Sequence, residues 1–193
     1  MNESYIVEKK FDANALSKNP LSIGVYDECQ FNNCDFQKQD LSKFSFIDCV
    51  FNHCNLSNAL VANTVFRDVL FNDCKILGVA FNDVLKNNLV VKFQNCTLDY
   101  CSFHQLKIPN FQLKDCSLVA VDFTECDLKQ TNFNNCNLQD AIFENTILIA
   151  TDFSTAYNYA IDPNKNQIKN AKFGLSGLPG LLHLYKIQID TSK

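Results

Sequence analysis

The sequence predicts an all-β solenoid in which the chain turns a corner every five residues around a narrow apolar tube. Every fifth residue is apolar from Phe31 to Phe81, and again from Phe93 to Phe153 after a register slip of two residues. All ten cysteines occupy one slot, two residues before these centres. A period of five fits neither an α-helix, at about 3.6 residues per turn, nor a flat strand, which alternates at every residue.

Two inward slots account for a composition with 17 Phe, 10 Cys and no Trp. Of the 17 Phe, 14 lie at the centres, and the slot two residues earlier holds mostly Cys, Ala, Val and Thr, with Gln39 and Asn166 as exceptions. No Asp or Glu between Tyr26 and Thr155 occupies either slot, as the cost of burying charge requires. We therefore expect one large and one small inward side chain on each side of the tube.

The repeated unit resembles that of the pentapeptide-repeat family. Clear copies of the pattern A/C-D/N-L/F-x-x are residues 34–38, 54–58, 126–130 and 136–140. The resemblance implies a right-handed quadrilateral β-helix in which four pentads form one coil, so that residues 20 apart stack at about one strand spacing, ~4.8 Å. The repeats make seven coils, and weaker apolar positions at Phe11, Leu16, Leu21 and Tyr26 could add another.

The expected domain organisation is a β-helix over residues 1–173, with a register slip near 84–92, followed by a tail over 174–193. Lys86, Asn87 and Asn88 lie at the slip and are expected to form a short loop, either a tolerated insertion or a binding element.

The tail is expected to form a short helix. Ser176 can cap its N-terminus, Pro179 is tolerated in a first turn, and a strand-like end follows at 187–189. Its apolar residues would fold over the last coil or pair with another subunit. The candidate dimer contacts are Leu178, Leu181, Leu182, Leu184 and Tyr185.

The two ends of the chain sharpen the resemblance. Residues 161–189, with Leu181–Tyr185 at their centre, are similar to the C-terminal end of Qnr-type proteins, and residues 5–10 are similar to the start of some members. Qnr and MfpA proteins mimic B-DNA, bind DNA gyrase and topoisomerase IV, and dimerise through the C-terminal helix; Qnr proteins thereby counter quinolones. Qnr proteins are longer and carry two loops, whereas MfpA lacks those loops and this chain shows one slip.

The charge distribution places the acidity on the solenoid. Residues 26–155 contain 16 acidic and 9 basic residues, whereas the whole chain carries −4. Glu28, Asp48 and Asp68 are expected to stack in successive coils, although like charges ~5 Å apart repel by about 1 kcal/mol in water. The candidate partner-binding residues of an acidic, DNA-mimicking face are Glu28, Asp48, Asp68, Asp73, Asp115, Asp122 and Glu125.

Other functional classes find little support in the sequence. His53, His104 and His183 lie beside no candidate nucleophile, and parallel stacked thiols would not converge on a tetrahedral zinc ion. We expect no enzyme, metal, cofactor, direct nucleic-acid binding or membrane segment. Without a signal peptide or an apolar run of membrane-spanning length, a cytoplasmic protein with buried, reduced thiols is expected.

Two alternatives to a topoisomerase-binding homodimer remain. The first is a repeat scaffold with another protein partner, and the second is a thiol-rich metal or redox protein. Asn32, Asn52 and Asn72 are interpreted as an amide ladder between coils in either case.

Overall fold

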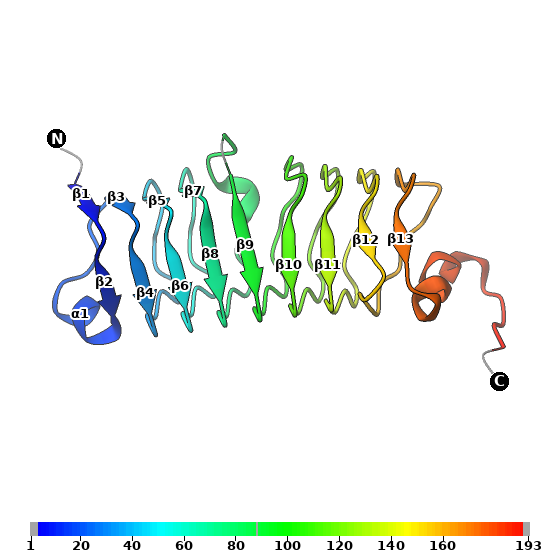
Figure 1. The fold of residues 1–193 in the computed structure, drawn as a ribbon, viewed down its shortest axis with the longest axis horizontal. Helices are drawn as coiled ribbons and strands as arrows, with labels where there is room; N and C mark the ends of the chain where they lie inside the picture. The colour runs from blue at the N-terminus through cyan, green and yellow to red at the C-terminus, as the bar shows by residue number, and fades with distance from the viewer. Residues whose placement is uncertain (1–3, 88, 191–193) are drawn as a thin grey trace.

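The computed structural model describes residues 4–87 and 89–190 and forms a straight rod of stacked coils (Figure 1). Strands pair in parallel with partners 20 residues away, for example Phe31 with Phe51. The expected right-handed quadrilateral β-helix, of about eight coils, is confirmed. Among the described residues, no helix has the length and apolar character needed to cross a membrane.

Two sides of the tube carry sheets, of which the second runs the whole length of the rod and the first ends before the register slip. Among the described residues, one sheet contains β1 (Ser4–Val7), β3 (Gly24–Asp27), β5 (Ser45–Ile47) and β7 (Val65–Arg67), in this order. The other contains β2 (Lys10–Asp12), β4 (Gln30–Asn32), β6 (Val50–Asn52), β8 (Val69–Asn72), β9 (Val91–Gln94), β10 (Gln112–Lys114), β11 (Asn132–Asn134), β12 (Asp152–Phe153) and β13 (Lys172–Phe173). The remaining two sides are joined by single parallel bridges, such as Asp35 with Asn55 and Ser102 with Asp122.

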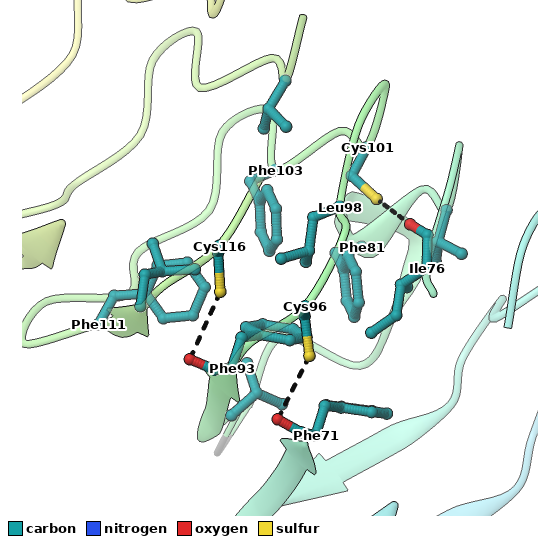
Figure 2. Close-up of a cluster of buried hydrophobic side chains, with 14 of the residues drawn as sticks. Phe71, Ile76, Phe81, Phe93, Cys96, Leu98, Cys101, Phe103, Phe111 and Cys116 are labelled. Carbon is teal, nitrogen blue, oxygen red and sulfur yellow. Dashed lines mark hydrogen bonds between the residues drawn. The ribbon is translucent and has the colours of Figure 1, made fainter. Parts of the chain in front are cut away.

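The interior contains the two inward slots that the repeat predicts. Phe rings at the centres stack from coil to coil, with centroids 4.6 Å apart for Phe31 and Phe51 and 4.9 Å apart for Phe51 and Phe71. All ten cysteines are buried, with free thiols. Figure 2 shows Cys96, Cys101 and Cys116 donating to backbone carbonyl oxygens within this packing. The small slot also accepts large buried side chains: Phe44, Leu106 and Phe111.

Most corners place one residue in the left-handed region of backbone space. This residue lies two positions after the centre, and non-glycine φ values there fall between 49° and 68°. Asn and Asp tolerate this conformation better than most residues. The corner slot therefore selects Asn and Asp for a backbone reason, independently of any partner.

A second backbone role explains Asp and Asn one position before the centre. The Asp40 carboxylate accepts the backbone N–H of Ser42 at 2.9 Å, and the Asn55 amide oxygen accepts that of Ser57 at 3.1 Å. These are Asx turns, which an aspartate or an asparagine can form. The fold therefore requires a side chain of the shape of Asp or Asn at this position, but it does not require a negative charge there.

The register slip lies between β8 and β9, where pairing shifts from 20 to 22 residues. A 3₁₀ helix, η1 (Phe81–Asp83), precedes it, and the following loop projects from the rod above β9 (Figure 1). Backbone N–H groups of Leu85 and Val90 bond to Thr64 and Phe66 of the preceding coil. The loop therefore absorbs two extra residues without interrupting the tube.

The N-terminal coil is partly helical. After β2, the helix α1 (Ala13–Lys18) replaces the pentads expected there, and Asp12 caps it by accepting the Ala15 N–H at 2.8 Å. Leu16 and Leu21 still pack half-buried against the core. The additional coil is present, but the sequence pattern did not indicate its helix.

The C-terminal segment closes the last coil. The short helix is present, as 3₁₀ segments η2 (Leu175–Leu181) and η3 (His183–Tyr185) rather than an α-helix, and residues 186–190 form no strand. Ser176 lies inside η2, and the capping position is Gly174 without a side-chain bond. The expected Ser176 cap and strand-like end were therefore wrong, because the helical segment begins earlier, where the Gly177 N–H donates to the Gly174 carbonyl three residues before it.

Candidate interaction surfaces

The predicted acidic residues lie along three edges of the rod. Glu28, Asp48 and Asp68 follow β3, β5 and β7 and form a column at the corner between the two sheets; we call this column the acidic edge. All three are exposed and adopt a positive φ, and none forms an ion pair with a described residue. The column is therefore an unneutralised row of carboxylates.

The other predicted acids belong to different edges. Asp73 and Asp115 follow β8 and β10 at the far corner of the nine-stranded sheet. Asp115 accepts from the Asn135 amide at 2.8 Å and lies 4.0 Å from the Lys114 ammonium. The single acidic face expected from the sequence is therefore divided, because these acids belong to different pentads of the coil and so lie at different corners.

Asp122 and Glu125 lie on the side opposite the nine-stranded sheet. Asp122 is bridged to Ser102 and Ile142 and lies 3.9 Å from the His104 ring nitrogen. Glu125 accepts from the Gln105 amide at 2.8 Å. Both carboxylates thus have polar neighbours in the preceding coil, unlike the acidic edge.

Basic side chains neutralise part of the C-terminal half of the rod. Lys129 lies 3.1 Å from Asp127, and Lys165 lies 3.0 Å from Glu144. Among the described residues, every ion pair involves residues from His104 onward. The N-terminal half therefore presents its carboxylates without local ion pairs.

Hydrogen bonds keep some of these carboxylates ionised. The Ser42 hydroxyl and backbone N–H hold the pKa of Asp40 below its ordinary value. The Ser154 hydroxyl likewise lowers the pKa of Asp152. Both groups therefore remain anionic well below neutral pH.

An apolar surface occupies the C-terminal end. Leu181 is half-buried against the core, whereas the other four candidate dimer residues are exposed. We call the exposed set the apolar end; it comprises Leu175, Leu178, Leu182, Leu184, Tyr185, Ile187 and Ile189. Leu181 therefore belongs to the cap of its own chain, and the remaining residues are free to contact a partner.

The loop at the register slip offers a smaller surface. Lys86 and Asn87 are exposed, as are the neighbouring side chains of Leu85 and Val90. Asn88, the third loop residue singled out in the sequence, lies outside the described residues. The apolar flanks of this loop were not anticipated.

The sides of the rod carry shallow hollows. One, of about 390 Å³, runs along β9, β10 and β11 and includes Lys92, Lys114 and Gln112. A second, of about 310 Å³, opens at the corner beside Cys96 and Cys116 and contains Asp115 and Tyr157. No three His, Cys, Asp or Glu side chains converge on a metal-sized site in the described part of the chain.

The amide ladder expected on the nine-stranded sheet is confirmed. The Asn52 amide donates to Asn32 at 3.0 Å, and the Asn72 amide donates to Asn52 at 3.5 Å. These side chains therefore link neighbouring coils, which is the structural role expected for them.

The fold defines a solenoid built from five-residue units, with contact surfaces on its edges and ends. A family model described as a pentapeptide repeat region matches residues 26–103 and 91–173. The chain belongs to the pentapeptide-repeat family. No curated protein matches it in sequence.

Solved structures resemble the chain from end to end. One structure of trypsin-treated QnrB1, a plasmid-mediated fluoroquinolone resistance protein, superposes with a TM-score of 0.64 at 17% identity, covering 97% of this chain and 98% of that chain. A second trypsin-treated QnrB1 structure gives 0.62 at 16% identity, covering 98% and 100%. At these identities the likeness establishes a shared fold.

Proposed function

We propose that this chain is a non-enzymatic, DNA-mimicking protein that binds DNA gyrase or topoisomerase IV and protects them from quinolones. The observation that carries the proposal is the end-to-end likeness in fold to QnrB1, a plasmid-mediated fluoroquinolone resistance protein. The acidic edge supports it, because stacked carboxylates repel one another and the fold accepts neutral Asn at the same corners.

The proposed complex places the rod in the DNA-binding groove of the enzyme. The carboxylates of the acidic edge, together with Asp73, Asp115, Asp122 and Glu125, substitute for phosphates opposite basic residues of the partner. The loop at Lys86 and Asn87 adds a contact on one side. This association is proposed for a cytoplasmic protein with no direct nucleic-acid, cofactor or membrane binding, and it weakens as salt screens the charges.

The proposed active form is a homodimer joined at the apolar end. Seven exposed apolar side chains on one short segment form a larger apolar surface than a monomeric rod requires. A two-fold contact at this end would double the length of the rod and leave the acidic edges exposed.

A supercoiling assay tests the proposal. Gyrase is titrated with the protein in the presence and absence of ciprofloxacin, with cleavage complexes scored on the same gels. We expect inhibition of supercoiling at high protein concentration and fewer drug-stabilised breaks at lower concentration. Neither effect at micromolar protein would refute a topoisomerase partner.

Charge-removing variants locate the contact. The triple variant Glu28→Gln/Asp48→Asn/Asp68→Asn removes the acidic edge while keeping side chains that suit the corners. The matched control Asp35→Asn/Asp40→Asn/Asp127→Asn removes the same charge from turn positions where Asn also occurs. The acidic-edge variant should lose at least tenfold in apparent affinity and the control much less; equal losses would assign the effect to net charge.

The second candidate is a repeat scaffold with a different protein partner. The ion pairs of Lys129 and Lys165 with neighbouring acids favour it, because they give the C-terminal half a mixed-sign surface. Pull-down with purified gyrase subunits at low salt separates the two, since the scaffold predicts no retention.

A further inference from the structure

Six of the ten cysteines form a continuous row through the core. The residues that follow them are bridged in parallel from coil to coil, from Asp35 with Asn55 to Ser117 with Asn137. The cysteines are therefore in register, one strand spacing (~4.8 Å) apart. We call this row the thiol column; its members are Cys34, Cys54, Cys74, Cys96, Cys116 and Cys136.

Neighbouring cysteines of the column contact one another from coil to coil. The backbone N–H of Cys74 donates to the Cys96 sulfur at 3.4 Å. The backbone N–H of Cys54 also donates to the Cys74 sulfur at 3.4 Å. Figure 2 shows the Cys96 and Cys116 sulfurs pointing the same way, while Cys101 lies on another side of the tube.

The spacing of the column suits linear coordination by two sulfurs. Metal–sulfur bonds are about 2.3 Å long for a first-row d¹⁰ ion, so two in line span ~4.6 Å, close to the coil spacing. The side chains point into the tube, so an ion between two sulfurs meets each one roughly at right angles to its Cβ–Sγ bond. That direction is where the sulfur lone pairs lie.

A surface hollow lies beside the column. The 310 Å³ hollow at the corner is lined by Cys96, Cys116 and Asp115. A carboxylate at the mouth attracts cations, and sulfur at the base selects soft ones.

We propose that the thiol column binds soft monovalent cations, Cu(I) or Ag(I), each held between two successive cysteine sulfurs. In each step one thiol proton is released to solvent, one metal–thiolate bond forms, and the neighbouring thiol donates a sulfur lone pair. One positive charge enters as one leaves, so the core stays neutral and avoids the cost of a buried charge.

The chain contains its own controls. Cys101 and Cys126 are buried to the same extent as the column, but their stacked neighbours are not cysteines: Val79 and Val121 for Cys101, and Leu106 and Thr146 for Cys126. Threonine is the matched replacement, because Thr146 donates to the carbonyl oxygen 23 residues earlier, as Cys54 does.

Silver binding to the folded, reduced protein tests the proposal. Silver nitrate is added in chloride-free buffer, and native mass spectrometry counts the ions per chain. Far-ultraviolet circular dichroism monitors the fold, and a pH electrode records proton release. The column variant Cys54→Thr/Cys116→Thr keeps one intact pair in the column, Cys74 with Cys96. It should bind at most half as many ions as the parent chain. The control Cys101→Thr/Cys126→Thr should bind as many ions as the parent chain.

Release of about one proton per silver ion, with an unchanged β spectrum, completes the expected result. The proposal is overturned if the column variant retains the parental stoichiometry or if the control loses as many ions. It is also overturned if the folded parent chain binds no silver, or binds it only with loss of the β spectrum. Anaerobic Cu(I) titration of the three proteins should give the same order.

Discussion

The corner residues show how a single backbone conformation shapes the surface of the rod. Most corner residues have a positive φ, and among these all but Gly78 carry a side chain. Asn or Asp suits this slot, whereas a bulky side chain there is strained. The acidic residues at corners thus combine a local backbone preference with a charge that the backbone does not require.

Tyr100 and Gly78 allow this preference to be measured. Tyr100 has φ of 63° and is 67% exposed, so its ring adds little packing. Tyr100→Asn should raise the free energy of unfolding by about 0.5–1 kcal/mol in urea titrations. Gly78→Ala should lower it by about 1 kcal/mol or more, because φ is +64° and the new Cβ would approach the Asn58 amide oxygen to 2.7 Å. Opposite signs would contradict the strain argument.

The buried thiols couple stability to alkaline pH. Burial raises the pKa of Cys101 and Cys126 from about 9 to about 12. Above pH 9 the unfolded chain loses these protons while the folded chain retains them, so the free energy of unfolding should fall as pH rises from 9 towards 12. Each such thiol contributes about 1.4 kcal/mol per pH unit within that window.

Urea titrations between pH 8 and pH 11 measure this fall. Cys101→Thr/Cys126→Thr should make the slope shallower by about 2–3 kcal/mol per pH unit relative to the parent chain. An unchanged slope would show that these two thiols titrate alike in the folded and unfolded chains.

The C-terminal cap shows how an element closes a solenoid. The backbone N–H of Ile161 donates to the Gly180 carbonyl, and Gly177 and Gly180 lie directly against Tyr159. Tyr159 is buried, and its ring contacts Phe153 and Phe173. The two glycines therefore let η2 cross the last coil and cover an otherwise open edge.

Gly180→Ala should loosen this cap. The added Cβ would approach the Tyr159 carbonyl oxygen to 2.0 Å, and backbone cannot move aside cheaply. We expect a loss of about 1–3 kcal/mol in stability and faster hydrogen exchange over residues 153–182. Ser176→Ala, at an exposed position of the same element, should change neither quantity.

At the scale of the whole molecule, the two ends of the rod differ. Strands β1 and β2 form open sheet edges at the N-terminal end, whereas the C-terminal end is capped and presents the apolar end (Figure 1). Assembly through the C-terminal end would leave the tube and its acidic edge unchanged.

Leu182→Asp tests the homodimer. Placing a carboxylate in the apolar end should halve the mass measured by sedimentation equilibrium, because a buried unpaired charge opposes association. The control Leu60→Asp changes an exposed leucine on the side of the rod and should leave the mass unaltered. A dimeric Leu182→Asp protein would place the interface elsewhere.

The sequence by itself determined the tube, its inward slots and its register slip. Each inward slot repeats every five residues. The apolar residues Phe31, Phe36 and Leu41, one from each of three successive pentads, are all buried. Because the period is repeated so often, it predicts the tube in spite of two exceptions in the small inward slot. Gln39 is exposed, and Asn166 is buried and donates to the Phe143 carbonyl.

Only the tertiary structure decided how residues from different coils meet. The acids divide among three edges, Tyr159 meets Gly177 and Gly180, and the thiols stacked before the slip continue into those stacked after it. These arrangements depend on four sides per coil and on the slip before β9. These contacts join residues about 20 apart, and helix α1 and the 3₁₀ cap replace the repeat at its ends. A five-residue period describes which side chains point inward, whereas coil geometry selects their neighbours.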